Sequence, residues 1–217
     1  MSYFDPSQES AMRTLRRLTL GLALAAVGLA AGCSDSSGPG DSTKPPSELN
    51  VVQLAPESPP LFNAEASFYA KKGEDRELRI YFQDEVGGSG EEFLRLRVDA
   101  PSLLARPDGT PFLPGDSIRI TVRVVDPSRI LFEMEPAGLT FSPLVPAELK
   151  IHYQEAEDDL NEDGTVDDSD TRIRGQLAIW RQEILGGAFE RLTSINSEEL
   201  EEIEASIPGF SRYAIAY

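Results

Sequence analysis

A two-residue hydrophobic period recurs from residue 61 onward and constrains this chain more than any other feature. Apolar and polar residues alternate most clearly in residues 78–82, 94–98 and 118–124. Strict alternation is typical of a strand with one buried and one solvent-facing side, whereas a helix repeats its apolar residues every three or four positions. The period therefore predicts strands.

Turn-forming residues separate the predicted strands. Glycine, proline and acidic residues cluster at residues 72–75, 87–90, 107–109, 114–116 and 186–187. Further strands are predicted around Phe132 and Met134, Leu149 to Tyr153, Leu177 and Ile179, Phe189, and Tyr213 and Ile215. Many short strands without long amphipathic helices between them predict an all-β fold, an antiparallel β-sandwich that forms a single domain over residues 61–217.

One segment of this region fits two local structures. Asn196 and Glu199 could form a capping box at the start of a helix, but Ile203, Ala205 and Ile207 alternate with polar residues. We expect a strand over the alternating residues, preceded at most by one helical turn.

The N-terminal region has the layout of a signal peptide. Arg13, Arg16 and Arg17 precede an apolar run that ends in small residues, and the run is too short to span a membrane. The signal peptide is predicted to cover residues 1–32. Because acidic residues precede the basic cluster, the true start is predicted at Met12.

The residues from Leu29 to Cys33 resemble the lipobox of bacterial lipoproteins. The resemblance implies that Cys33 carries a lipid and becomes the mature N-terminus, so that the protein is exported and attached to a membrane. Ser34 resembles the signal for sorting to the outer membrane. Cys33 is the only cysteine, which excludes an intramolecular disulfide. The alternative is an ordinary signal peptide with an incidental cysteine.

Residues 33–60 are rich in Ser, Gly, Pro and Asp and are predicted to form a flexible tether. Val51, Val52 and Leu54 could add an edge strand, but Pro56 and the prolines at 59 and 60 favour an ordered body that begins after them.

The chain is strongly acidic, with a formal net charge of −17. Such a surface repels nucleic acid and anionic lipid headgroups and attracts divalent cations. An acidic surface used only for solubility is the alternative. We expect a monomer with a protein partner in the envelope and no nucleic-acid partner.

The strongest local motif is an acidic loop over residues 159–170. It fits the calcium-loop pattern of oxygen-bearing residues at positions 1, 3, 5, 9 and 12, with glycine at position 6. The predicted calcium ligands are the side chains of Asp159, Asn161, Asp163 and Asp170, the carbonyl of Thr165, and a water held by Asp167. The alternative is an acidic turn that binds nothing.

This loop resembles the EF-hand-like loop of dockerin repeats, which also ends in Asp. Strands are predicted on both sides of it, and a paired second loop is absent from the sequence. We therefore expect a weak structural calcium site, with a dissociation constant of about 10⁻⁴ to 10⁻³ M, rather than a cohesin-binding dockerin.

Five segments resemble the ZU-type domain, which is named for zonula-occludens proteins and netrin receptors and occurs in many bacterial lipoproteins. They are residues 96–101, 115–122, 135–143, 149–153 and 209–214. The resemblance, over residues 93–217, implies a β-sandwich used for protein interaction. In some members a His-Phe-Ser triplet cleaves itself, but here Gly209 precedes Phe210 and Ser211, so self-cleavage is not expected.

The sequence shows no catalytic motif: a nucleophile elbow, a Walker loop and a dinucleotide fingerprint are all missing. His152 is the only histidine, and it is predicted to lie on a polar strand face. Four arginines are expected to pair with neighbouring carboxylates: Arg95, Arg97, Arg119 and Arg123. A polyanionic ligand is the alternative for these arginines.

The sequence thus predicts a non-enzymatic, lipid-anchored envelope protein that serves as a structural or protein-interaction module with a calcium-stabilised loop. The alternative is a carbohydrate-binding accessory domain at the cell surface. An exposed Trp180 beside Tyr153, Phe189 or Tyr213 would favour sugar stacking, and a buried Trp180 would favour the interaction module.

The anchor gives the first prediction. Cys33→Ser removes the lipid acceptor, so the mutant is expected to remain unprocessed or to fractionate with soluble protein. Membrane fractionation and the mass of the mature N-terminus measure this. Wild-type processing and membrane partition of the mutant would contradict it.

Overall fold

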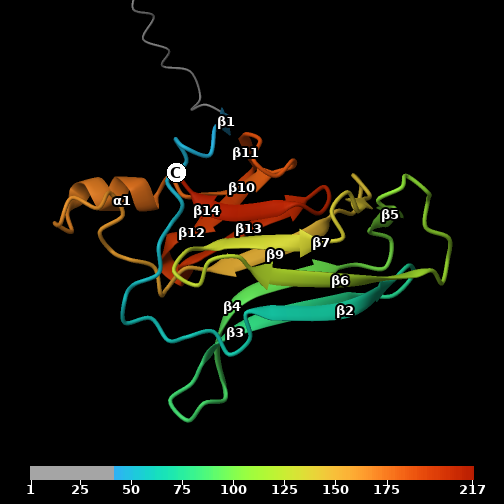
Figure 1. Cartoon of the computed structure of the whole chain (residues 1–217), viewed down its shortest axis with the longest axis horizontal. Coiled ribbons are helices and arrows are strands. Elements are labelled where there is room, and N and C mark those ends of the chain that lie inside the picture. Colours follow the sequence, from blue (N-terminus) through green and yellow to red (C-terminus); the bar gives the residue numbers. More distant parts are fainter. Residues whose placement is uncertain (1–41) are drawn as a thin grey trace, which may run out of the picture. The chain divides into compact units, whose positions relative to one another are not determined.

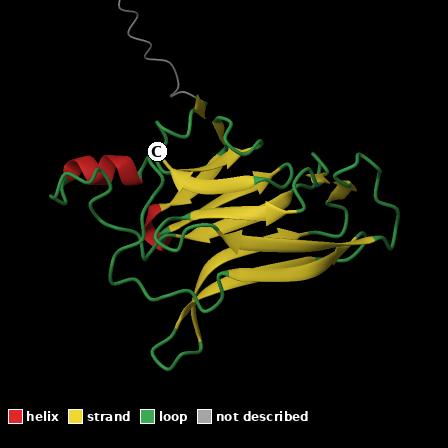
Figure 2. Ribbon diagram, in the orientation of Figure 1, coloured by secondary structure: helices red, strands yellow, loops and turns green. Residues whose placement is uncertain are grey.

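The computed structural model describes residues 42–217, and their regular structure is almost entirely strand (Figure 2). The strands are β1 (Thr43–Lys44), β2 (Glu65–Lys71), β3 (Arg76–Gln83), β4 (Ser89–Val98), β5 (Leu103–Ala105), β6 (Ser117–Val124), β7 (Leu131–Glu135), β8 (Thr140–Phe141), β9 (Ala147–His152), β10 (Ala178–Gln182), β11 (Phe189–Arg191), β12 (Ser194–Ser197), β13 (Glu202–Ile207) and β14 (Arg212–Ala216). The helices are α1 (Asp168–Arg174) and the 3-10 turn η1 (Glu198–Leu200).

Two antiparallel sheets carry the fold (Figure 1). Sheet A has seven strands in the order β1-β11-β10-β14-β7-β6-β2, and sheet B has five in the order β12-β13-β9-β4-β3. Strands β5 and β8 form a small separate pair. The predicted all-β sandwich is therefore confirmed, and the described residues belong to one compact unit.

The core lies between the two sheets, where the alternating apolar residues meet in one cluster. Aromatic rings connect the layers: Phe82 of β3 lies 5.0 Å from Phe93 of β4, which lies 6.4 Å from Phe132 of β7. Full burial of one such ring contributes roughly 1.5–3 kcal/mol. These contacts join sheet B to sheet A.

The strands predicted from the two-residue period are present. Residues 78–82, 94–98 and 118–124 lie within β3, β4 and β6, and the ambiguous segment forms the turn η1 followed by β13, as expected. Strand β2 was not singled out in the sequence, because its inward side carries two alanines beside Phe68 and therefore gives a weak apolar signal.

The prediction of a flexible tether up to Pro60 is wrong for residues 42–60, the part that the structure describes. We call residues 42–60 the strap. Strand β1 pairs with β11, and Leu49, Val52 and Leu54 are buried. The Val52 amide donates to the Ile215 carbonyl at 3.0 Å, and the Ile130 amide donates to the Val52 carbonyl at 2.9 Å. The strap is thus part of the folded body.

The strap is ordered because sheet A is apolar on its outer side as well. Ala178 and Trp180 of β10 and Ala216 of β14 are buried there in a second cluster with Leu49. A strand buried on both sides has a continuous apolar run in its sequence rather than an alternating one, as residues 178–180 of β10 and 213–216 of β14 do. Proline does not prevent this order, because the Pro60 carbonyl accepts a hydrogen bond from the Gln83 amide at 2.8 Å.

The predicted signal peptide, Cys33 and the first part of the predicted tether lie outside the described residues. Within residues 42–217, no helix is both long enough and apolar enough to cross a membrane.

The strap gives a stability prediction. Val52 is only 2% exposed, so Val52→Ala should lower the free energy of unfolding by about 2 kcal/mol through lost burial and a residual cavity. Glu48→Ala, at an exposed position of the same segment, should change it by less than about 0.5 kcal/mol. Chemical denaturation measures both values. Equal, negligible effects would mean that the strap does not contribute to stability.

Candidate metal centre

The predicted calcium loop follows β9 and ends within α1 (Figure 1). The expectation of strands on both sides was wrong on the exit side, because α1 begins at Asp168, position 10 of the loop. Asp167 is the N-cap of α1 and Asp170 completes a capping box with it. An Asp three residues before another Asp was the sequence signal for this helix start.

The entry side of the loop is closed by Asp159. Its carboxylate accepts hydrogen bonds from the amide of Asp163 at 3.1 Å and from the amide of Gly164 at 2.7 Å. Gly164 has a φ of +87°, which a residue with a side chain rarely adopts. The glycine at position 6 is therefore required by the turn, as the pattern predicted.

The exit side of the loop is closed by Asp170, whose side chain is almost fully buried at 2% exposure. Its carboxylate accepts hydrogen bonds from the Asp167 amide at 2.9 Å and from the Asn161 amide at 3.2 Å. The bond from the Asp167 amide is the main reason why the pKa of Asp170 is lowered. Hydrogen bonds from the Ser169 hydroxyl and amide likewise lower the pKa of Asp167. Both carboxyl groups are thus held in the charged form.

The middle of the loop is held by its own polar side chains. The side-chain amide of Asn161 donates to Asp163 Oδ2 at 3.1 Å and to Ser169 Oγ at 2.8 Å. The Thr165 amide donates to Asp163 Oδ1 at 2.9 Å. Ser169 was not among the predicted site residues, although it bonds to both Asn161 and Asp167.

The structure brings the predicted ligands together in pairs rather than around one point. Within residues 42–217, no three His, Cys, Asp or Glu side chains are gathered as metal ligands. The carboxylates of Asp159, Asp163, Asp167 and Asp170 instead accept backbone amide bonds from the loop itself. A carboxylate oxygen that accepts one hydrogen bond keeps a second lone pair, so these groups retain capacity for a cation.

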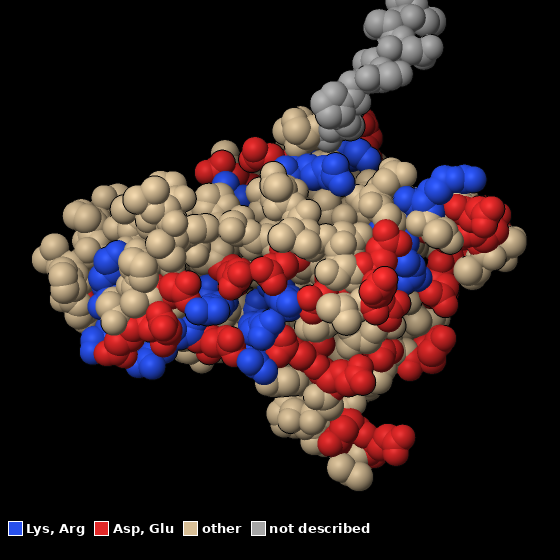
Figure 3. All heavy atoms as spheres, turned by 180° about the vertical axis from the view of Figure 1, so that it is seen from behind, with Lys and Arg blue, Asp and Glu red and all other residues tan. Residues whose placement is uncertain are grey.

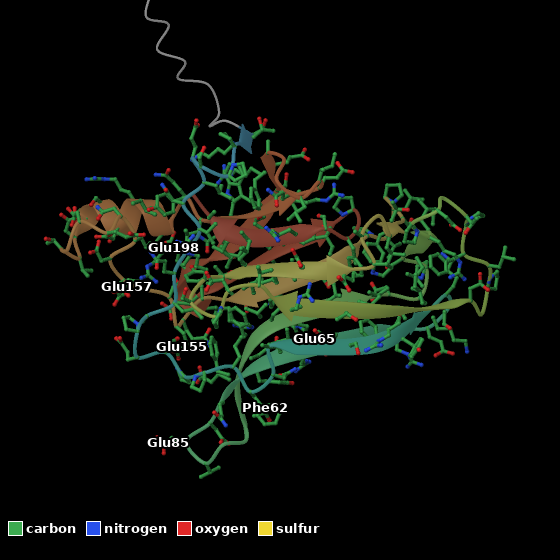
Figure 4. All side chains as sticks on the ribbon, viewed as in Figure 1. Phe62, Glu65, Glu85, Glu155, Glu157 and Glu198 are labelled. Atoms are coloured by element: carbon green, nitrogen blue, oxygen red, sulfur yellow. The ribbon has the colours of Figure 1, made fainter. Side chains whose placement is uncertain are left out.

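Segments far apart in the sequence hold the loop against the body. Leu160 is buried in the main core, and its carbonyl accepts a hydrogen bond from the Tyr217 hydroxyl. Gln53 of the strap donates through Nε2 to Glu162 Oε1 at 2.6 Å, and its carbonyl accepts from the Glu157 amide at 2.9 Å. Figure 4 shows Glu157 on the side of the molecule that the strap crosses. No local pattern in the sequence predicts these long-range contacts.

Many of the other charged side chains form ion pairs on the surfaces of the two sheets. On sheet B, Lys150 lies 2.7 Å from Glu202, and the His152 Nε2 atom lies 3.5 Å from Glu92 Oε1. The predicted pairing of arginines with carboxylates is confirmed for Arg95, Arg97 and Arg123, whereas Arg119 donates to Ser67 Oγ. Acidic and basic side chains also lie interspersed in the view from behind (Figure 3).

The chain has no room for a histidine at the position that precedes Phe210. A Cβ on Gly209 would lie 2.5 Å from the Leu139 carbonyl oxygen, because the two backbones are adjacent there. The Ser211 hydroxyl accepts a hydrogen bond from Arg181 Nε at 3.2 Å, and a guanidinium cannot act as a base. Among residues 42–217, the Ser211 hydroxyl is therefore bonded to a group that cannot activate it as a nucleophile.

The aromatic residues named for sugar stacking are all buried. Trp180 is 2% exposed, and its indole N–H donates to the Ala216 carbonyl at 3.0 Å. Tyr153, Phe189 and Tyr213 are buried as well. None of these four rings is available as a flat binding platform.

Comparison of the chain with protein-family models, with curated proteins and with solved structures finds no match in any of the three.

Asp170 gives a prediction with a defined pH dependence. Because the pKa of Asp170 is lowered in the folded state, its stabilising effect is fully present above the ordinary value of 3.8 and is lost as the pH falls below it. Asp170→Asn should therefore lower Tm by several degrees at about pH 6, and the difference from wild type should vanish towards about pH 2.

The matched control is Asp168→Asn, which removes the same charge from an exposed position in the first turn of α1. It should change Tm far less. A pH-independent difference for Asp170→Asn would contradict the proposed role of its charge.

Proposed function

We propose that this chain is a non-enzymatic module of the cell envelope, anchored through a lipid on Cys33, that binds a protein partner and is stabilised by calcium in the loop 159–170. The observation that supports it best is the closure of this loop from both ends by Asp159 and Asp170. The resemblance to ZU-type domains supports a protein partner, and Ser34 supports the outer membrane as the location.

Calcium suits this loop because it prefers six to eight hard oxygen ligands in a flexible shell. Side-chain oxygens of Asp159, Asn161, Asp163 and Asp170 would hold it, with the Thr165 carbonyl and a water on Asp167 completing the shell. A bound cation would offset the repulsion among these carboxylates. The helix after the loop adds similarity to helix–loop–helix calcium motifs, which also place a helix at the exit.

The proposal of a non-enzymatic role is supported by the state of the reactive side chains. His152 lies beside Glu92 and Glu202 on sheet B. The Ser211 hydroxyl accepts a hydrogen bond from Arg181 of β10, which belongs to sheet A. A serine nucleophile is commonly activated by an adjacent base, and these two residues are not paired.

A carbohydrate-binding role has less support. Sugar binding of the expected kind needs an exposed aromatic ring, and Trp180 is instead packed beneath the strap with Leu49. The Lys44 ammonium lies 5.6 Å from the centroid of the Trp180 ring. The protein-interaction role is therefore the one we propose.

Calcium gives a thermal prediction. With a dissociation constant of about 10⁻⁴ M, about 10 mM calcium should add about 2.7 kcal/mol of stability if only the folded chain binds. Asp159→Asn should abolish most of this gain, because position 1 supplies a direct ligand. Differential scanning calorimetry with and without calcium, at matched ionic strength, measures the gain.

Asp168→Asn is the matched control, because it removes the same charge from a non-ligand position of the same loop. Its calcium gain should equal that of wild type. Equal gains in calcium and magnesium, or an undiminished gain in Asp159→Asn, would show that the loop is only an acidic turn.

A further inference from the structure

Strand β2 is the free edge of sheet A. It pairs only with β6, in an unbroken register from Glu65 opposite Arg123 to Lys71 opposite Ser117. Figure 1 shows β2 at the lower margin of the sheet, and Figure 4 shows Glu65 at the start of this strand. An unpaired strand edge is a template for another strand, so natural proteins usually protect it.

The register defines which backbone groups of β2 are unpaired. The Val124 amide donates to the Ala64 carbonyl and the Lys72 amide donates to the Asp116 carbonyl, both at 2.8 Å. Hydrogen-bonded and non-hydrogen-bonded residue pairs alternate along an antiparallel pair of strands. The even-numbered residues of β2 therefore bond to β6, and the odd-numbered residues direct their N–H and C=O groups away from it. Among the described residues, the backbone groups of Ser67 and Tyr69 have no partner.

The neighbouring edge, on β3 of sheet B, is protected in two ways. Its register shifts at Tyr81, and its end is covered by the segment before β2, where the Phe62 amide donates to the Tyr81 carbonyl at 2.9 Å. At the other end of sheet A, β1 has only two residues. Strand β2 has seven residues, no bulge and no proline. It is the long regular edge that nothing in the described chain covers.

The sequence of β2 is complementary to itself. When two copies lie antiparallel about Phe68, each Glu65 faces Lys71 of the second copy and each Ser67 faces Tyr69 of the second copy. This register joins odd-numbered residues to odd-numbered residues, and it places Ser67 opposite Tyr69, the two residues whose backbone groups are free. We propose that the β2 edge pairs with β2 of a second copy, so that sheet A continues across a symmetric dimer.

The side chains agree with this register. Glu65 and Lys71 are opposite in charge and would lie on the same side of the joined sheet. Lys71 pairs with Glu74 within its own chain, but Glu74 also lies 2.5 Å from Arg76, so Lys71 can turn to Glu65 without leaving Glu74 unpaired. Tyr69, 66% exposed in the single chain, would be partly covered. The proposal replaces the expected monomer and does not depend on calcium.

The dimer is expected to be weak. Two paired strands of this length cover less than the roughly 1,000 Å² of a stable interface. Self-association should therefore depend on concentration in the micromolar to millimolar range, and sedimentation equilibrium of the purified protein measures it.

Cysteine cross-linking tests the register directly. In a Cys33→Ser background, which removes the only native cysteine, Phe68→Cys places two thiols opposite each other at a Cα distance of about 4.5 Å, within disulfide range. Ala66→Cys is the matched control on the same side of the strand, because its two thiols would lie about 13 Å apart along the strand. Mild oxidation should cross-link the first variant at least tenfold faster than the second.

Charge exchange tests the ion pairs independently. Glu65→Lys and Lys71→Glu should each weaken the dimer by roughly tenfold, since two attractive pairs become repulsive. The double variant Glu65→Lys/Lys71→Glu restores both pairs in reverse and should restore the wild-type constant. Circular dichroism would show that each variant is folded.

Three results would overturn the proposal: a wild-type chain that stays monomeric at millimolar concentration, equal cross-linking at positions 66 and 68, or no restoration by the double variant. Binding of a foreign strand by a chain that does not self-associate would also overturn it, because the edge would then serve another partner.

Discussion

The hydrogen bonding of the strap to β14 and to the residue before β7 is the contact on which the rest of this structure depends. Val52 accepts from Ile130 and donates to Ile215, so one residue of the strap joins two segments of sheet A. Its side chain enters the main core. The following residue, Gln53, bonds to Glu157 and Glu162 at the acidic loop. The position of the loop therefore follows from the position of the strap.

Contacts with the loop backbone and with the folded body explain how the loop accommodates its charge. A chain with a net charge of −17 carries several carboxylates in one loop, where they repel one another. Backbone amides at both ends of the loop bind these groups, and Tyr217 at the end of the chain fixes Leu160 inside the body. Core packing thus fixes the backbone of the loop, and the side chains of Asp163 and Asp167 remain exposed where a cation can reach them.

Most of the sandwich could be predicted from the sequence, because a strand with one buried side repeats every two residues. The alternation in residues 118–124 identified β6 correctly. Strands β10 and β14 were recognised, but their second buried side was not, although Ala214 and Ala216 make β14 continuously apolar. That continuous run was the available signal for a covering segment, and the prolines of the strap obscured it.

The tight turn of the candidate site could be predicted from the sequence, but the contacts between the loop and the rest of the fold could not. The glycine at position 6 has the left-handed conformation that the pattern requires. The capping pair at the start of α1, Asp167 and Asp170, is a local sequence signal for the helix that follows the loop. The contacts of Gln53 and Tyr217 with the loop could not be predicted, because they join residues more than 50 positions apart and depend on the complete fold.

The central claim is that one calcium ion binds in the loop 159–170 and that the loop is coupled to the strap. A calcium titration followed by amide NMR tests it most directly. We predict saturable shifts confined to the amides of residues 159–170, Gln53 and Tyr217, with the Gly164 amide among the largest. Small, unsaturated shifts spread over acidic residues throughout the chain would contradict the claim.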